Sequence, residues 1–124
     1  MSNIQIKRVY AEALPSDGRR VLVDRLWPRG LTKEQAAVHV WMKEIAPSHE
    51  LRKWFHHDPA QFDAFKEKYK RELQQDAGKL ELLKQLREWE REDILTFVYS
   101  AKDPHNNQAI LLKQWIENNE LDLD

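Results

Sequence analysis

The amino-acid sequence predicts an α/β fold with a mostly parallel central sheet of about three to four strands and helices on both faces. Strand-like and helix-like segments alternate along the chain, which is the order typical of parallel sheets. Residues 21–23 form an uninterrupted apolar run, as expected of a strand covered on both faces. The length of 124 residues suits one hydrophobic core, so we expect a single α/β domain over residues 1–124.

Several segments carry strand signals. Residues 4–10 (IQIKRVY) alternate between apolar and polar side chains and precede a turn signal at residues 15–18. Residues 20–26 (RVLVDRL) follow as the second predicted strand. Residues 38–42 (VHVWM) are a third candidate, and the β-branched and aromatic residues 94–100 (ILTFVYS) predict the last strand.

Capping residues indicate where the first helices begin. Thr32, with Gln35 three residues later, has the spacing of a capping box and predicts a short helix. Ser48 can cap a second helix, and Asp58, which precedes a proline, can cap a third. The buried face of the third helix is expected to consist of Phe62, Phe65, Tyr69 and Leu73.

Two more helices are predicted in the second half of the chain. Leucines at helical spacing predict one after Gly78, and residues 108–117 predict the closing helix. Trp41 and Trp115 lie in apolar periodic segments, so we expect both in the core. The acidic tail over residues 117–124 is expected to fray in solvent.

Composition excludes several classes of function. Charged residues make up 33% of the chain but the net charge is −1, which argues against a broadly basic nucleic-acid surface. Cysteine is absent, which excludes disulfides, zinc thiolate sites and thiol nucleophiles. The three glycines are too scattered for a phosphate-binding loop. His56 and His57 are adjacent and lack metal-ligand spacing, so neither a metal nor a cofactor is predicted.

Hydropathy also bears on location. No apolar run approaches the roughly 20 residues needed to span a membrane, and the first residues lack the apolar core of a signal peptide. We therefore expect a cytoplasmic protein with no membrane partner.

Charged side chains gather where two of the predicted strands end. VLVDRLWPRG (21–30) leads from a strand toward a helix, and so does ILTFVYSAKDPHNN (94–107). In open α/β sheets, ligands bind beyond the carboxyl ends of the strands, near helix N-termini that favour anions. If these two strands are parallel neighbours, their end residues converge. The candidate ligand-binding residues are Arg8, Arg25, Trp27, Arg29, Ser100, Lys102, Asp103 and Asn106.

These residues also have structural interpretations. Asp24 is either the partner of an arginine such as Arg8 or Arg25, or a catalytic base. Arginine side chains suit phosphate groups, yet they also form ordinary surface ion pairs. Trp27 either fills space in the packing or stacks on a base.

Three functions remain open at this point. We expect an anion-binding pocket at the carboxyl edge of the sheet, for a phosphate, a nucleotide or a nucleic-acid end. One alternative is a metal-independent hydrolase or transferase that acts on a phosphorylated or nucleic-acid substrate with Asp24 as its base. Another is a protein-interaction or regulatory module that uses exposed aromatic side chains, since the chain has five tryptophans.

Four segments carry a family resemblance: RVLVDRLWPRG (20–30), KEIAPSHELRKWFHHDP (43–59), FKEKYKREL (65–73) and FVYSAKDPHNNQAILL (97–112). Together they resemble the YeaO-like family, a bacterial domain of unknown function numbered 488, over nearly the whole chain. The resemblance implies a small cytoplasmic α/β domain. It brings no established activity, so it transfers no catalytic residue. It does imply that the family signature lies at the two charged strand ends.

Overall fold

A parallel sheet forms the centre of the computed structural model, which describes residues 2–123. Its four strands lie in the order β1-β4-β2-β3, and all three neighbouring pairs are parallel. The strands are β1 (Ile4–Arg8), β2 (Arg19–Leu22), β3 (Val40–Trp41) and β4 (Leu95–Tyr99). Every residue of β4 is buried, because this strand has a neighbour on each side and side chains packed on both faces. The predicted α/β fold is therefore confirmed.

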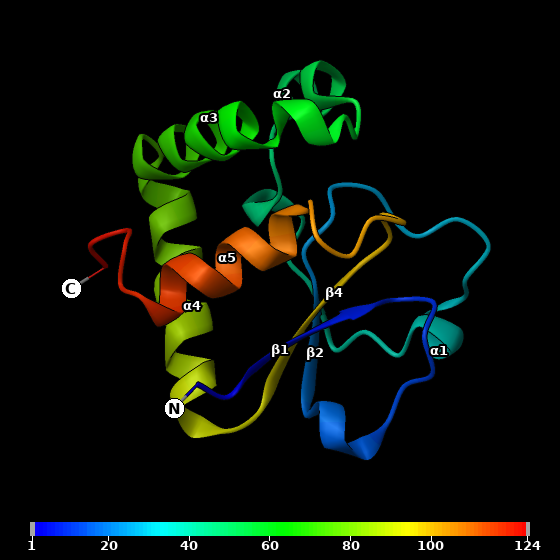
Figure 1. The fold of residues 1–124 in the computed structure, drawn as a ribbon. Coiled ribbons are helices and arrows are strands. Elements are labelled where there is room, and N and C mark those ends of the chain that lie inside the picture. Colours follow the sequence, from blue (N-terminus) through cyan, green and yellow to red (C-terminus); the bar gives the residue numbers. More distant parts are fainter. Residues whose placement is uncertain (1, 124) are drawn as a thin grey trace.

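Helices cover both faces of the sheet. They are α1 (Lys33–Ala36), α2 (His49–Phe55), α3 (Phe62–Gln74), α4 (Ala77–Glu92) and α5 (Gln108–Glu117). Short 3-10 turns occur at Pro15–Asp17, Lys43–Ile45 and Pro59–Gln61. In Figure 1, α3, α4 and α5 lie on one side of the sheet and α1 lies on the other. The predicted caps are present: the side chains of Thr32, Ser48 and Asp58 each accept a hydrogen bond from a backbone N–H at the start of the next helix or turn.

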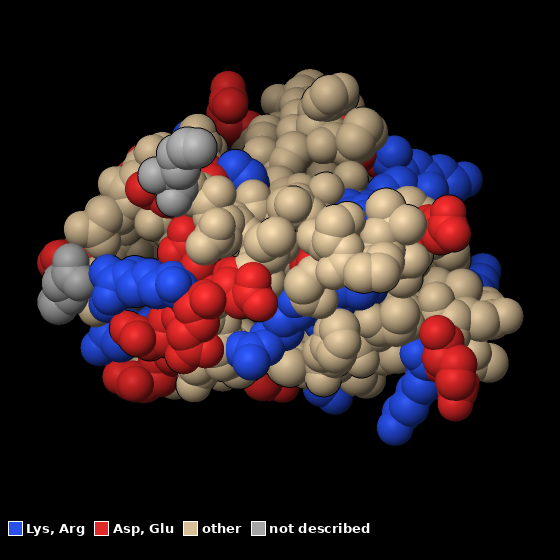
Figure 2. All heavy atoms as spheres, turned by 90° about the horizontal axis from the view of Figure 1, so that it is seen from below, with Lys and Arg blue, Asp and Glu red and all other residues tan. Residues whose placement is uncertain are grey.

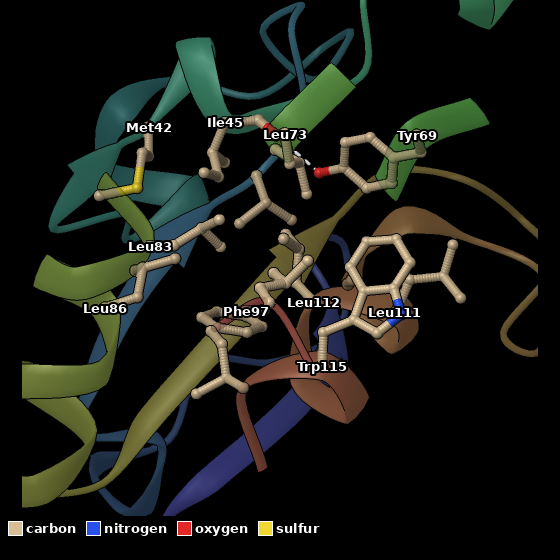
Figure 3. Packing of buried hydrophobic residues seen from close by; sticks show 14 of the residues in the cluster. Met42, Ile45, Tyr69, Leu73, Leu83, Leu86, Phe97, Leu111, Leu112 and Trp115 are labelled. Atoms are coloured by element: carbon tan, nitrogen blue, oxygen red, sulfur yellow. Dashed lines mark hydrogen bonds between the residues drawn. The ribbon is translucent and has the colours of Figure 1, made fainter. Parts of the chain in front are cut away.

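The larger part of the hydrophobic core lies between the sheet and α3, α4 and α5. Figure 3 shows side chains of these helices meeting over Phe97 of β4. The face predicted for α3 is largely confirmed, since Phe65, Tyr69 and Leu73 are buried. On the other face of the sheet, a small cluster of Val9, Leu22, Ala36 and Val98 packs with Trp27.

Three expectations about the periphery need correction. Trp115 is fully buried as predicted, but the core position expected for Trp41 is wrong, because its side chain lies on the edge strand β3 and is 39% exposed. The strand expected over residues 38–42 is only two residues long. The acidic tail does not fray within residues 118–123, where Leu121 and Leu123 pack into the core.

The segment before α2, residues 44–48, joins the sheet to the helical layer and is buried at residues 45–47. Its backbone carbonyls accept hydrogen bonds from side chains of other elements, including the Tyr69 hydroxyl, which donates to Ile45 O at 2.6 Å (Figure 3). Lys79 of α4 donates to Glu44 O. Glu72 of α3 accepts from the backbone N–H and the hydroxyl of Ser48. Because buried polar groups must be paired, these contacts hold the segment in one position.

The Tyr69 hydrogen bond yields a first stability prediction. Tyr69→Phe removes one oxygen from a fully buried side chain and leaves Ile45 O without that donor. We expect the free energy of unfolding to fall by about 1–3 kcal/mol, the cost of an unpaired buried acceptor. Urea denaturation of the variant and the wild type measures this. Tyr10→Phe is the matched control, because it removes the same oxygen from a side chain that is 42% exposed, where water can replace the lost hydrogen bond, so it should cost less. A Tyr69→Phe variant as stable as the wild type would contradict the prediction.

Gly18 permits a close approach between the turn before β2 and the start of β4. Its φ is +61°, and a Cβ atom there would lie 2.3 Å from the Ile94 carbonyl oxygen. That carbonyl accepts the Arg19 N–H at 3.1 Å, so it cannot move without losing a hydrogen bond. Gly30 also has a positive φ, +83°, but no atom lies within 4 Å of its Cβ position.

Both glycines have a positive φ, but only Gly18 also meets a neighbouring backbone, so the two positions differ in cost. We expect Gly30→Ala to lower the free energy of unfolding by about 1–2 kcal/mol, the penalty of a left-handed backbone for an L-residue. Gly18→Ala adds the clash and should cost roughly 3–5 kcal/mol, the sum of strain and overpacking. Thermal denaturation of both variants measures the difference. Equal losses would show that the Ile94 contact is relieved at no cost.

Candidate site at the carboxyl edge of the sheet

Parallel pairing brings the carboxyl ends of the four strands to one edge. In the register of the sheet, Arg8 of β1 lies opposite Tyr99 of β4, and Leu22 of β2 lies opposite Val98. The loops after β2 and β4 therefore leave the sheet at the same end, the upper end in Figure 1. The parallel neighbourhood on which the convergence argument depended is confirmed. The positions of individual side chains decide what this edge can do.

Asp24 lies in the middle of this edge and joins the two loops. Its Oδ2 accepts the Ser100 N–H at 2.8 Å and the Ser100 hydroxyl at 2.7 Å. Its Oδ1 accepts the side-chain amide of Gln108, the first residue of α5. Asp24 is 8% exposed, and these partners take the place of the arginine expected beside it. The carboxylate therefore links β2, β4 and α5.

Burial raises the pKa of the Asp24 carboxyl above its usual value. The hydrogen bonds from Ser100 and Gln108 and the positive charge of Arg52 act in the opposite direction and do not overcome it. A raised pKa is a property of many catalytic acids and bases. A catalytic base must also reach its substrate. Here both carboxylate oxygens already accept hydrogen bonds from the protein.

Two of the predicted anion ligands donate to backbone carbonyls instead. Arg8 donates from Nε to Ala101 O at 3.0 Å and from Nη2 to Ser100 O at 3.1 Å. Arg25 donates in the same manner to Pro47 O and Ala46 O, at 3.0 and 3.2 Å. Each guanidinium thus holds two consecutive carbonyls of a loop. These contacts give both arginines a role in positioning the loops, and their role in binding a ligand stays a prediction.

Arg29 and Lys102 differ from those two arginines. Both are exposed, and within residues 2–123 neither side chain makes a hydrogen bond or ion pair. Their backbone positions are nevertheless fixed by neighbours. The Tyr10 hydroxyl donates to Arg29 O at 2.9 Å, and Lys102 directly follows the carbonyl of Ala101 that Arg8 holds. The Arg8 guanidinium lies 5.1 Å from the centre of the Tyr10 ring, so the contacts of Arg8 and Tyr10 connect the two loops that carry Arg29 and Lys102.

Asp103 and Asn106 shape the loop after β4. Asp103 accepts hydrogen bonds from the backbone N–H groups of His105 and Asn106 and from the Asn106 side chain. The side-chain bond from Asn106, with the backbone bonds, holds the pKa of Asp103 below its usual value. Asn107 donates to Asp103 O and caps α5. These groups fold the loop and present Lys102 at its surface.

Trp27 is a packing residue in this structure. Its Nε1 donates to Leu31 O at 2.7 Å, and its ring meets that of Trp41 edge-on at 5.5 Å between centres. Trp41 in turn donates to Asp24 O at 2.8 Å. Of the two interpretations of Trp27 from the sequence, these contacts favour packing.

The two described pockets lie away from the carboxyl edge. One of about 580 Å³ is lined by Ser2, Glu90, Arg91 and Glu117 among others, and one of about 430 Å³ lies beside residues 13–20. Both are near the amino ends of the strands, the lower end in Figure 1. Figure 2 views the molecule from that side and shows acidic and basic side chains interspersed. Such a face lacks the single sign of charge that attracts an anion.

Neither a metal cluster nor a membrane-spanning helix occurs among residues 2–123. They contain no group of three or more His, Asp or Glu side chains arranged to hold a metal ion. No helix in this part of the chain has the length and apolar character needed to cross a membrane.

Comparisons with known proteins identify the family. A family model described as "Inactive DUF488-N3 subclade" matches residues 3–124. The chain belongs to this family. The DUF488 chain is 46% identical to Uncharacterized protein YeaO of Escherichia coli (strain K12) over 114 residues, which cover 92% of this chain and 96% of that protein. It is 39% identical over 113 residues to Uncharacterized protein Rv3073c of Mycobacterium tuberculosis (strain ATCC 25618 / H37Rv), 91% and 92% of the two chains. No solved structure matches the DUF488 chain.

The sequence did not predict a buried ion-pair network in this DUF488 member. Asp17 and Arg20 form a buried ion pair at 2.7 Å, and Lys7 binds the same carboxylate at 3.1 Å. Arg20 also donates to Ala36 O and Ala37 O, which ties α1 to β2. Burial acts to raise the pKa of Asp17, but hydrogen bonds from Leu14 N–H, Lys7 and Arg20 outweigh it and lower the pKa overall. No spacing rule in the sequence predicts this network.

Asp17 and Asp24 should affect the pH dependence of stability in opposite directions. Asp17 has a lowered pKa when folded, so its stabilisation is present above the usual aspartate pKa of about 3.9 and is lost as the pH falls through the folded value. Asp24 has a raised pKa when folded. Its contribution is fully present below the unfolded pKa and is lost as the pH rises through the folded value.

This opposition is measurable with two asparagine variants of the DUF488 chain. Asp17→Asn breaks a buried ion pair and should cost about 3–5 kcal/mol near neutral pH, with a smaller cost near pH 3. Asp24→Asn should lower the free energy of unfolding less near neutral pH than near pH 3. Near neutral pH the wild type carries a buried charge at this position, and asparagine does not. Urea denaturation at both pH values checks both variants. The same direction of change in both would contradict the assignment.

Proposed function

We propose that this protein binds a phosphate-bearing anion at the carboxyl edge of its sheet and does not turn it over. The observation that supports binding is the pair of exposed cations Arg29 and Lys102 on loops whose backbones are held by Tyr10 and Arg8. A cation on a positioned loop loses less conformational freedom on binding than one on a mobile loop. Phosphate groups suit both side chains, since guanidinium forks pair with their oxygens and ammonium groups bind them as point charges.

Two observations support binding without catalysis. Asp24 is buried, and both of its oxygens accept hydrogen bonds from Ser100 or Gln108, so it is poorly placed to take a proton from a substrate. The matching family model is described as an inactive subclade. The hydrolase or transferase alternative would require Asp24 to leave these partners. Phosphate-bearing metabolites are abundant in the cytoplasm, which is the compartment we propose.

A protein-interaction surface is the second candidate. Leu26 is 59% exposed and Trp41 is 39% exposed, and Lys43 lies 5.2 Å from the Trp41 ring centre. Exposed large apolar side chains are a feature of interaction sites. This candidate predicts that apolar substitutions matter and that Arg29 and Lys102 do not.

Binding of simple anions tests the proposal. We expect inorganic pyrophosphate and ribose 5-phosphate to raise the melting temperature of the wild type, with about 2.7 kcal/mol of stabilisation at a ligand concentration 100 times the Kd. Arg29→Ala and Lys102→Ala should each weaken binding by roughly fivefold, the effect of about 1 kcal/mol from one exposed charge. Calorimetric titration at low and high salt measures the affinities. They should fall with salt because the contacts are exposed.

Lys84→Ala is the matched control. Lys84 is also exposed, but it lies within α4 and pairs with Glu81. Its removal changes the net charge by the same amount without touching the carboxyl edge. If the control weakens binding as much as Arg29→Ala, or if no anion binds the wild type, the proposal is wrong. The second result would favour the Trp41 surface.

A further inference from the structure

Tyr10 is an exposed aromatic side chain next to the proposed anion site. It follows β1 by two residues and is 42% exposed. Its hydroxyl donates to Arg29 O, so the ring is tied to the loop that carries one of the two exposed cations. The Arg8 guanidinium lies 5.1 Å from the ring centre, and Arg8 is itself held by two carbonyls of the other loop. The Tyr10 ring is therefore held by a hydrogen bond to one loop and by the Arg8 guanidinium, which is bound to the other loop.

This arrangement combines the two elements that recognise nucleotides. Aromatic rings stack on bases, and every base has a flat face that can stack. Cations beside the ring bind the phosphate. A fixed ring with a guanidinium nearby binds a base at low entropic cost, because two contacts already restrict its rotation.

We infer that the ligand of the carboxyl edge is a nucleotide unit, with its base stacked on Tyr10 and its phosphate on Arg29 and Lys102. This inference rests on the proposed function and specifies its ligand. The stacking role expected for a tryptophan moves to Tyr10, because Trp27 is packed against Trp41 and bonded to Leu31 O. Trp54 is 40% exposed, but it lies on α2 beside Lys68 of α3 and has no described contact with the loops of the carboxyl edge.

The experiment compares ligands with and without a base. AMP and ribose 5-phosphate carry the same phosphate and sugar, so the ratio of their Kd values isolates the base. We expect AMP to bind the wild type at least about fivefold more tightly, the lower end of what one stacked base contributes. Tyr10→Leu should abolish this ratio. Because it also removes the hydroxyl that holds Arg29 O, Tyr10→Phe is the matched control: it loses the same hydrogen bond but keeps the ring, so it should weaken ribose 5-phosphate as much as Tyr10→Leu does and still keep the ratio. Tyr10→Trp keeps an aromatic face and should preserve the ratio.

Arg29→Ala separates this inference from the proposed function. It should weaken both ligands by a similar factor and leave their ratio intact. Equal affinities for AMP and ribose 5-phosphate in the wild type, or a ratio that survives in Tyr10→Leu, would overturn the nucleotide inference while the anion site stands. If neither ligand binds, the proposed function and this inference fail together. Circular dichroism of each variant confirms that it is folded.

The source of the nucleotide unit is settled by oligonucleotides. A free nucleotide and the 5′ end of a single strand offer the same base and phosphate. We expect a 5′-phosphorylated trinucleotide to bind in the same Tyr10-dependent manner as AMP if nucleic-acid ends are accepted. If it binds only as weakly as its unphosphorylated form, the site takes free nucleotides. In both cases the dependence on Tyr10 is the supporting result.

Discussion

Arginine side chains that bind pairs of backbone carbonyls hold this protein together. Arg8, Arg20 and Arg25 each donate from Nε and Nη2 to two consecutive carbonyls, those of residues 100–101, 36–37 and 46–47. The physical reason is the same in each case. A parallel sheet needs long connections that cross its faces, and their buried carbonyls must find donors outside any helix or strand. A guanidinium offers two donors in a fixed fork that suits two neighbouring oxygens.

This use of arginine explains where sequence reasoning succeeded and where it stopped. The fold followed from local signals, because capping residues such as Thr32 and apolar runs such as residues 95–99 act over short distances. The convergence of two charged loops also followed, once the strands were taken as parallel neighbours. The sequence did not predict which groups the charged side chains bind. A guanidinium binds a phosphate and a carbonyl pair with the same donors, so the sequence alone leaves Arg8 and Arg25 undecided.

Trp41 and Tyr10 show the same limit for aromatic residues. Trp41 lies in an apolar segment, and periodicity placed it in the core. The structure instead puts it on the edge strand, where only one neighbour covers it. Strand order depends on contacts between distant segments, so a short edge strand and a central one give similar local patterns. Tyr10 ends an alternating strand segment, and nothing in its neighbours indicates that its hydroxyl binds Arg29 O.

At the carboxyl edge, the buried hydrogen bonds of Asp24 fix the loops, and two exposed cations, Arg29 and Lys102, lie on their surface. Asp24 joins Ser100 and Gln108 inside the protein, and its burial keeps this carboxylate away from a ligand. Asp103, on the same loop as Lys102, accepts hydrogen bonds from His105 and Asn106. The burial of Asp24 favours the binding of anions, because an exposed carboxylate in the middle of the edge would repel them. These hydrogen bonds hold the loops, so the anion binding that we propose requires little ordering of the backbone. A site whose acid is buried and whose cations are exposed is suited to hold a phosphate group and poorly suited to activate a nucleophile against it.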